Sequence, residues 1–355
     1  MHSIRLLGAL ALVVAAFGCA GHSHSPSLSS NGPQLRVGES VVLAGETPAK
    51  LAFGPFDVDS FKVRNTYLDG LPQTVHYEAG VDFTIDPDSA TIKRMPRSRI
   101  PDFRTNILYG QEDFDQTKFP GFGNGPYFVF VDYFSTRGPG WPEQPPQANF
   151  LPRTLARIHA GEKISLVAFG DSITAGGEAT GPALVYWQHW ADWLGQKYPF
   201  SKIETINAAT GGDTTVNGLA RLQEKVLSRH PDLVLIAFGM NDANRPPFGV
   251  PVEMFAQNLR VMVDRIRSET QAEIILCSAF PPNPKWHWAS GKMEAYALVT
   301  EQVAREKQCA YADVYHNWRK LAATKKPEDL LGNNINHPND FGHGIYFEVL
   351  TRLGL

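Results

Sequence analysis

"KISLVAFGDSITAGG", residues 163–177, joins a continuous apolar run to a turn of glycine and small polar residues. Similar apolar runs recur along the chain, separated by segments of helix length, at residues 203–209, 232–239, 272–280 and 310–315. Within one separating segment, apolar side chains repeat at helical spacing: Phe255, Leu259, Met262 and Ile266. Continuous apolar strands alternating with amphipathic helices predict a mainly parallel sheet covered on both faces. We therefore expect an α/β/α sandwich over residues 155–355.

The preceding segment, residues 34–137, has a different pattern. Short runs alternate apolar and polar residues, as in "PYFVFVDYF" at 126–134, and Gly, Pro and Asp interrupt them at short intervals. "VHYEAGVDFTI" likewise predicts one face made of Val81, Phe83 and Ile85. Because no helical period is present, we expect a β-sandwich-like accessory domain of antiparallel strands. A Pro-rich hinge, residues 138–154, is expected to join it to the α/β domain.

The N-terminus has the order of an export signal. In residues 1–19 an Arg precedes an apolar run of roughly a dozen residues, fewer than the ~20 that a membrane-spanning helix needs. Two interpretations remain: a lipoprotein signal with lipid on Cys19, or an ordinary cleaved signal peptide. A flexible linker over 20–33 is expected to follow. The protein should then be periplasmic, on the cell surface or secreted, with membrane contact only through Cys19.

Composition and charge exclude several classes of protein. The chain of 355 residues has 43% hydrophobic and 19% charged residues, as soluble globular proteins do. Lys and Arg number 33 against 36 Asp and Glu, so no excess of positive charge favours nucleic acid as a partner. Cys277 and Cys309 lie in apolar runs, which favours two buried thiols, although an exported protein can also form a disulfide.

Four turns carry the residues that indicate chemistry, because ligands bind at the carboxyl ends of parallel strands. Ser172 follows the first strand, and the Gly211–Gly212 pair follows the second and can expose a backbone N–H to a bound oxygen. Asn241 follows the third, and His337 comes shortly before the expected last helix. Each residue has an ordinary alternative, a helix cap, a simple turn or a loop residue, but their combination favours a serine nucleophile with a histidine base.

The motifs "GDSIT" at 170–174, "NAATGGDTTVNGLARL" at 207–222, "GMND" at 239–242 and "NHP" at 336–338 resemble the four blocks of the SGNH (GDSL-type) hydrolase superfamily, in order. The resemblance covers about the last 200 residues. It implies a flavodoxin-like α/β fold, ester hydrolysis through an acyl-enzyme, and no cofactor. It also implies that Ser172 is the nucleophile and His337 the base, and that the oxyanion hole consists of the Ser172 and Gly212 N–H groups with the Asn241 amide.

Asn334 departs from this pattern, because most members have Asp three residues before the histidine. Aspartate would hold the imidazole and stabilise its charged form, whereas a neutral amide can do only the first. Three interpretations remain: Asn334 or a backbone carbonyl orients His337, another carboxylate such as Asp340 replaces it, or the site only binds. We expect no metal at His337, Asp340 and His343, because Pro338 interrupts the stretch, and we expect His343 to be structural.

Substrate contacts are expected from loops at the same edge of the sheet. Trp286 and Trp288 predict either a platform for sugar rings or packing against the β-rich domain, and Arg245 is a candidate contact for an anion. An exported member with a β-rich companion resembles bacterial carbohydrate esterases that remove O-acetyl groups, so acetylated carbohydrate is the expected substrate. The alternatives are a lipolytic esterase, lysophospholipase or thioesterase, an O-acetyltransferase, and a polysaccharide-binding protein with an impaired site.

Overall fold

The structure, a computed structural model, describes residues 33–136, 141–244 and 249–355. Residues 31–355 form one compact unit. The predicted export signal, the linker up to residue 32 and Cys19 lie outside the described residues. Within the described part of the chain, no helix is both long and apolar enough to cross a membrane.

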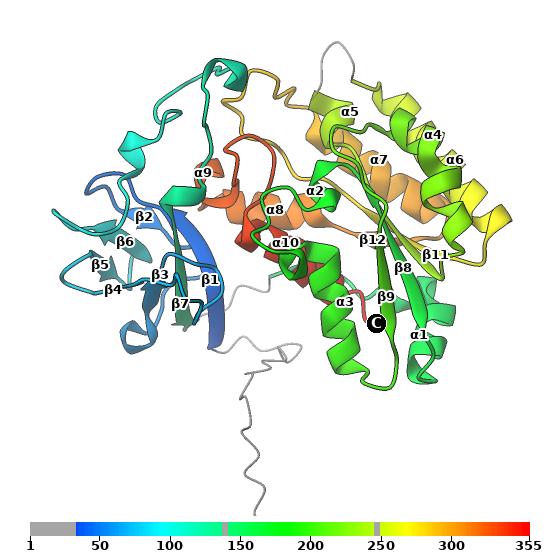
Figure 1. Cartoon of the computed structure of the whole chain (residues 1–355), viewed down its shortest axis with the longest axis horizontal. Coiled ribbons are helices and arrows are strands. Elements are labelled where there is room, and N and C mark those ends of the chain that lie inside the picture. Colours follow the sequence, from blue (N-terminus) through cyan, green and yellow to red (C-terminus); the bar gives the residue numbers. More distant parts are fainter. Residues whose placement is uncertain (1–32, 137–140, 245–248) are drawn as a thin grey trace, which may run out of the picture. The chain divides into compact units, whose positions relative to one another are not determined.

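The centre of the C-terminal segment is a parallel sheet of five strands in the order β12-β11-β10-β8-β9. Each predicted apolar run forms one strand, so the expected parallel sheet is confirmed (Figure 1). The strands are β8 (Ile164–Gly170), β9 (Ile203–Asn207), β10 (Leu233–Ala237), β11 (Glu273–Cys277) and β12 (Ala310–Ala312).

Helices cover both faces of this sheet, as the continuous apolar strands predict. Leu166 and Ala168 of β8 share one core with α3 (Tyr186–Lys197), α8 (Val314–Ala322) and α10 (Asp340–Thr351). Val167 and Phe169 point to the other face and pack with α4 (Thr215–Lys225), α6 (Val252–Glu269) and α7 (Met293–Glu306). The helical repeat that begins at Phe255 is the buried side of α6. The α/β/α sandwich is therefore confirmed.

The N-terminal segment contains two small antiparallel sheets and, among its described residues, no α-helix. Val129, Val131 and Tyr133 are buried on one side of β7, as their alternation predicts. In the other predicted run Phe83 is buried, but Val81 is 58% exposed because it lies in the turn before β5; that part of the prediction is wrong. One sheet consists of β1 (Gln34–Val42), β7 (Phe128–Ser135), β3 (Lys62–Arg64) and β4 (His76–Tyr77), and the other of β2 (Ala49–Lys50), β6 (Thr91–Arg94) and β5 (Phe83–Asp86).

The β-rich segment shares its core with the α3, α8 and α10 side of the sandwich. A buried ion pair joins them, with 3.0 Å between Glu39 Oε1 of β1 and Lys325 Nζ, just after α8. The backbone N–H of Val42 also donates to Asp329 of α9 (Pro327–Leu330) at 2.9 Å. These contacts place the β-rich segment against the stretch that precedes His337. A separate accessory domain over 34–137, with a hinge over 138–154, stays a prediction.

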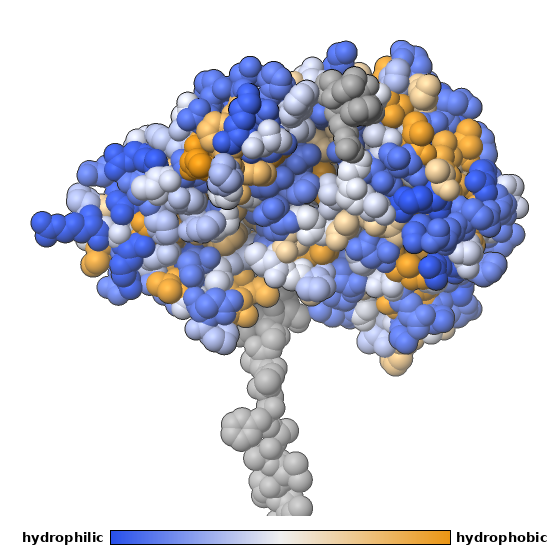
Figure 2. Space-filling view, turned by 45° about the horizontal axis from the view of Figure 1, so that its top comes forward, coloured by the Kyte–Doolittle hydropathy of each residue, from blue (hydrophilic) through white to orange (hydrophobic). Residues whose placement is uncertain are grey.

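The two cysteines in the described residues, Cys277 and Cys309, are free and buried, as their apolar surroundings predict. Desolvation raises the pKa of the Cys309 thiol to about 11 and raises that of Cys277 further. Both thiols are therefore unreactive side chains of the core. Figure 2 shows a face of the molecule that is mostly hydrophilic, with apolar residues in small groups.

Candidate active site

Ser172 lies at the carboxyl end of β8, where it begins the short helix α2 (Ser172–Ala175). The turn is fixed locally, because Asp171 accepts a hydrogen bond from the N–H of Ile173 at 2.9 Å. The chain also passes too close to β10 for any side chain at position 170, since a Cβ added at Gly170 would lie 2.4 Å from the Ala237 carbonyl oxygen. The Gly-Asp-Ser motif is therefore explained by local geometry. Gly170 allows the close approach to β10, and Asp171 caps the start of α2.

His337 meets Ser172 although 165 positions separate them in the chain. The distance from His337 Nε2 to Ser172 Oγ is 2.8 Å, which is hydrogen-bond distance. Burial lowers the pKa of His337 below its usual 6.5, so the imidazole is neutral at neutral pH. A neutral imidazole in contact with the hydroxyl can accept its proton.

The glycine pair borders the same serine, and Asn241 is bonded to the turn that carries the pair. A Cβ added at Gly211 would lie 3.8 Å from the Ser172 Cβ, and Gly212 has a left-handed φ of 78°. Asn241, in α5 (Met240–Asn244), donates from its side-chain amide to the Asp213 carbonyl at 3.0 Å, which ties the third turn to the second. Three turns from three adjacent strands thus lie together, at the edge where the sheet topology predicts them.

Two buried carboxyl groups stabilise these turns. Burial is the main cause that raises the pKa of Asp171 to about 7, and burial also raises the pKa of Asp242 to about 6. One oxygen of Asp242 accepts from both the backbone N–H and the hydroxyl of Thr215, at 2.9 and 2.5 Å. Because Thr215 starts α4, this contact fixes the segment that follows the glycine pair.

Asn334 occupies the position of the usual aspartate, but its amide oxygen points elsewhere. It accepts from Asn124 Nδ2 and from Asn283 Nδ2, both at 3.2 Å, and Asn283 also donates to the Asn334 carbonyl at 2.9 Å. Its backbone is left-handed, with φ 59°, a conformation that asparagine tolerates better than most residues. Among the described residues no hydrogen bond joins Asn334 to His337. The expected orienting contact is therefore replaced by a structural one, which fixes the stretch that carries the histidine.

Asp340 and His343 bind the loop after α2 instead of His337. Asp340 accepts from the Thr180 N–H at 2.8 Å and from its hydroxyl at 2.6 Å. The Nε2 of His343 lies 3.1 Å from the Gly177 carbonyl oxygen, and burial lowers the pKa of this histidine to about 4. A neutral His343 then donates from Nε2, which agrees with the structural role expected for it. In the described part of the chain no cluster of three His, Cys, Asp or Glu could hold a metal ion.

The predicted substrate contacts have different outcomes. Trp286 packs in a cluster with Phe114 of the β-rich segment and with Ile335 of the histidine stretch, and its indole N–H donates to Gln116 at 2.7 Å. Of the two alternatives for Trp286, a sugar platform or packing against the β-rich segment, the structure shows the packing. Trp288 is half-buried with its ring edge-on to His287, and its role as a sugar platform stays a prediction. Arg245 lies outside the described residues.

Gly177 and Asn124 were not among the residues predicted from sequence, yet both bear on the site. A Cβ added at Gly177 would lie 2.8 Å from His337 Nδ1, so only glycine fits there. The consecutive glycines at 176 and 177 are a weak sequence signal for this. Asn124 is fully buried and donates to the Leu331 carbonyl at 2.9 Å as well as to Asn334. Nothing in the sequence near residue 124 indicates that contact.

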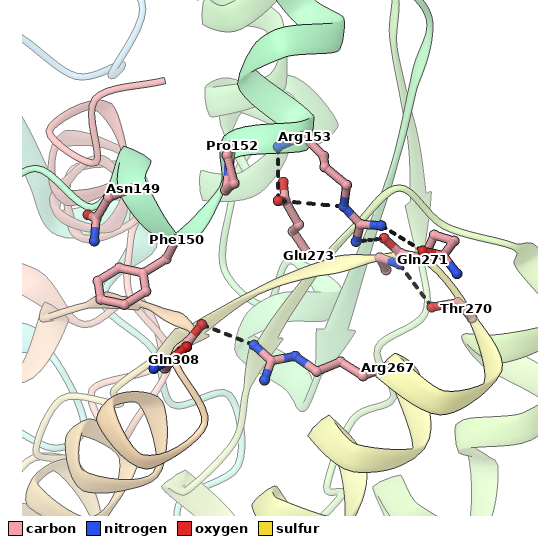
Figure 3. Close-up of a pocket in the computed structure, with 10 residues that line it drawn as sticks. Asn149, Phe150, Pro152, Arg153, Arg267, Thr270, Gln271, Glu273 and Gln308 are labelled. Atoms are coloured by element: carbon pink, nitrogen blue, oxygen red, sulfur yellow. Dashed lines mark hydrogen bonds and ion pairs between the residues drawn. The ribbon is translucent and has the colours of Figure 1, made fainter.

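A pocket of about 300 Å³ lies at the opposite end of the sheet, next to the start of β11. Figure 3 shows Arg153 reaching across it to Gln271 and Glu273, with Arg267 bound to Gln308 on the other side. Arg153 is paired with Glu273, and Arg267 donates to the Gln308 carbonyl. Ser172 follows the carboxyl end of β8, which runs parallel to β10 and β11. The pocket and the serine therefore lie at opposite ends of the strands.

Comparisons with known proteins find a family match and several similar esterases. The model of the GDSL-like Lipase/Acylhydrolase family matches residues 168–345. An arylesterase of Vibrio mimicus is 34% identical over 153 residues, 41% of this chain and 69% of the relative. An acetylxylan esterase of Geobacillus stearothermophilus is 26% identical over 211 residues, 55% of this chain and 95% of the relative. A solved acetylxylan esterase structure from the same organism matches 54% of this chain and 94% of its own, with 26% identity and a TM-score of 0.48.

The matched region begins inside β8 and ends inside α10, so it includes the serine turn, the glycine pair, Asn241 and His337. By this match and by its relatives, the chain belongs to the GDSL-like lipase/acylhydrolase family and is a carboxylic ester hydrolase of the SGNH type.

Proposed function

We propose that Ser172 and His337 carry out ester hydrolysis and that the substrate is an O-acetylated carbohydrate. The observation that carries the proposal is the 2.8 Å contact between Ser172 Oγ and His337 Nε2, at the carboxyl edge of the sheet. A serine hydroxyl is a weak nucleophile at neutral pH and needs a base within hydrogen-bond reach. His337 is that base, since burial keeps its imidazole neutral by lowering its pKa.

In this mechanism Ser172 Oγ attacks the acetyl carbonyl while His337 Nε2 takes the hydroxyl proton. The tetrahedral intermediate collapses as His337 returns that proton to the departing sugar oxygen, which leaves an acetyl group on Ser172. Water then attacks the acyl-enzyme with His337 again as the base, and acetate leaves. Protons balance in both halves, and no cofactor takes part.

The negative charge of the intermediate is assigned to an oxyanion hole built by the Ser172 and Gly212 backbone N–H groups and the Asn241 side chain. The close approach of Gly211 to Ser172, and the hydrogen bond from Asn241 to Asp213, support this assignment. Removing one such donor typically costs ~100- to 1000-fold in kcat. An Asn241→Ala variant is therefore expected to fall in that range.

The acetylated carbohydrate is supported by the acetylxylan esterase relative, which matches this chain over 95% of its own length. The β-rich segment adds a second reason, because the Asn124 N–H donates to the Gly332 carbonyl at 2.6 Å, next to the histidine stretch. A polymer bound at Ser172 would then extend along the β-rich segment. The N-terminal pattern supports export, and Cys19 is proposed as a lipid anchor, which makes accessible extracellular polysaccharide the natural substrate class.

Purified protein with p-nitrophenyl acetate tests the mechanism. Ser172→Ala should lower kcat by at least ~1000-fold, because loss of a serine nucleophile removes the acyl-enzyme route. Ser228→Ala, an exposed serine that hydrogen-bonds only within its own segment, is the matched control and should retain full activity. Equal rates for wild type and Ser172→Ala would exclude the serine mechanism.

Substrate class is tested by comparing acetylated xylan with long-chain acyl esters, with released acetate or fatty acid as the measurement. Acetate release from xylan with a higher kcat/KM is expected. A preference for long-chain esters would instead favour a lipolytic enzyme or thioesterase, and binding to xylan without turnover would favour an impaired binding protein. Transfer of the acetyl group to an added sugar would indicate an acetyltransferase.

A further inference from the structure

His337 needs a group at Nδ1, and the expected candidates are engaged elsewhere. The Asn334 oxygen accepts from Asn124 and Asn283, and the two Asp340 oxygens accept from Thr180. An attacking serine leaves its proton on the imidazole, and a carboxylate at the other nitrogen stabilises the resulting charge. The described side chains therefore leave one question open: which carboxylate can reach His337 Nδ1.

The loop of residues 176–180, which we call the 176–180 loop, passes directly over that nitrogen. A Cβ added at Gly177 would lie 2.8 Å from His337 Nδ1. Helix α10 holds the loop at both ends, since His343 bonds the Gly177 carbonyl and Asp340 bonds Thr180. The loop is therefore anchored beside the imidazole by two separate contacts.

Glu178 is the next residue after Gly177 and has an unusual backbone. Its φ is 64°, in the left-handed region that a non-glycine residue without a short polar side chain rarely adopts. Such conformations persist where the surrounding structure imposes them, and they cluster at functional sites. Here the contacts from α10 hold Gly177 and Thr180, the residues on either side of this position.

The Glu178 side chain points along the histidine stretch. A Cβ added at Gly332 would lie 2.5 Å from Glu178 Cβ and 3.0 Å from its Oε2, so Gly332 leaves the space that this side chain fills. Gly332 in turn donates its N–H to the His337 carbonyl at 2.9 Å. Within the described residues no hydrogen bond or ion pair engages the Glu178 carboxylate. Glu178 is an exposed residue, although burial raises the pKa of its carboxyl group. The carboxyl group lies next to the backbone of Gly332, which bonds the His337 carbonyl.

We propose that Glu178 is the positioning carboxylate of His337, in place of the aspartate that is missing at position 334. The proposal rests on the proposed function of Ser172 and His337. Rotation about the side-chain bonds of Glu178 brings an oxygen onto the Nδ1–H when Ser172 attacks the ester carbonyl and the imidazole takes up the serine proton. The acid of the triad would then come from the loop after the nucleophile, not from the histidine stretch.

The test uses the full-length protein with p-nitrophenyl acetate. Glu178→Gln keeps the size of the side chain and removes its charge, and Glu178→Gly removes the side chain and relieves the left-handed backbone. Both should lower kcat by about 100-fold or more with little change in KM, as loss of a triad carboxylate does. Glu178→Asp should recover part of the rate. Glu301→Gln, an exposed glutamate of α7, is the matched control and should not change it.

A pH profile separates positioning from a structural role. The other described titratable groups beside His337 are His343 and Asp340 of α10, and neither changes in Glu178→Gln. A nearby carboxylate raises the pKa of an imidazole. Removal of the Glu178 charge should therefore move the acid limb of the kcat/KM profile to lower pH, by about one unit. The proposal would be overturned if either variant, Glu178→Gln or Glu178→Gly, had the wild-type rate, or if only Glu178→Gln lost activity. It would also be overturned if both variants lost activity without a shift in the acid limb of the kcat/KM profile.

An NMR titration of His337 keeps this test independent of turnover. The His337 signal is assigned by its absence in His337→Asn, and its pKa is compared between the wild type and Glu178→Gln. A lower pKa in the variant is expected, and an identical pKa overturns the proposal even if the protein does not hydrolyse the ester. Failure of the serine mechanism is distinguished from failure of the Glu178 proposal, because it would give equal rates for the wild type and Ser172→Ala.

Discussion

The serine turn and the histidine stretch supply the two groups that meet at 2.8 Å, but they are held in different ways. The serine turn is fixed by its own neighbours, since Asp171 caps the N–H two residues later. The histidine stretch is held by side chains from far away, with Asn124 reaching it across 210 positions and Asn283 across 51. One half of the site thus follows from local turn chemistry, and the other half depends on how distant segments pack.

Among the changes that test how the two halves are held, the largest effect is expected where they touch, at Gly177. In Gly177→Ala the new Cβ would lie 2.8 Å from His337 Nδ1 and 3.0 Å from the Ser172 carbonyl, so the imidazole must move. A displacement of ~1 Å of a catalytic group can cost ~100-fold. We expect kcat/KM for p-nitrophenyl acetate to fall by about that factor.

Gly181→Ala is the matched control for that change. A Cβ at Gly181 meets nothing within 4 Å, and its φ of −161° is extended backbone that any residue adopts. Its activity should equal that of the wild type. Equal losses in both variants would mean that the whole segment 176–181 is sensitive to substitution, and that Gly177 has no special relation to His337.

A smaller effect is expected when the distant support of the histidine stretch is removed. Asn124→Ala removes one of two donors from the Leu331 carbonyl and one of two from the Asn334 side-chain oxygen, which should cost about 1–3 kcal/mol of unfolding free energy. Because this donor fixes the stretch that carries His337, kcat/KM per folded molecule should fall as well, by roughly tenfold, or ~1.4 kcal/mol. Thermal unfolding and kinetics measure the two effects.

Asn65→Ala separates the two consequences, because the Asn65 side chain bonds only its own segment, at Val75 and Gln73. It should lower stability without changing kcat/KM. If Asn124→Ala also leaves kcat/KM unchanged, the distant support stabilises the fold without positioning the base.

The smallest effect on activity is expected for Asn334→Asp. Its oxygen would still accept from Asn124 and Asn283, so the new carboxylate stays turned away from His337. We expect kcat/KM to change by less than about tenfold, or ~1.4 kcal/mol, and thermal stability to fall because position 334 is only 2% exposed. A sharp rise in activity would mean that the variant side chain turns to His337 and completes a triad that the native site lacks.

Much of the fold could be predicted from the sequence, because its causes are local. Each apolar run from β8 to β12 forms the expected strand, since a strand buried on both faces needs continuous apolar residues. The β-rich segment was predicted less well: Val81 fits the alternation of a strand but lies in a turn, where the short-range pattern says nothing about burial.

By itself the sequence determined the parallel sheet and the turns with Ser172, the glycine pair and Asn241 that follow its strands, because turn chemistry and strand order follow from neighbouring residues. Only the tertiary structure decided which groups surround the base. Asn334 is turned to Asn124, Gly177 lies beside His337, and Glu178 lies beside Gly332, through contacts between segments that are far apart in the chain. Such contacts depend on how distant segments pack, and the residues next to each position in the chain do not reveal this.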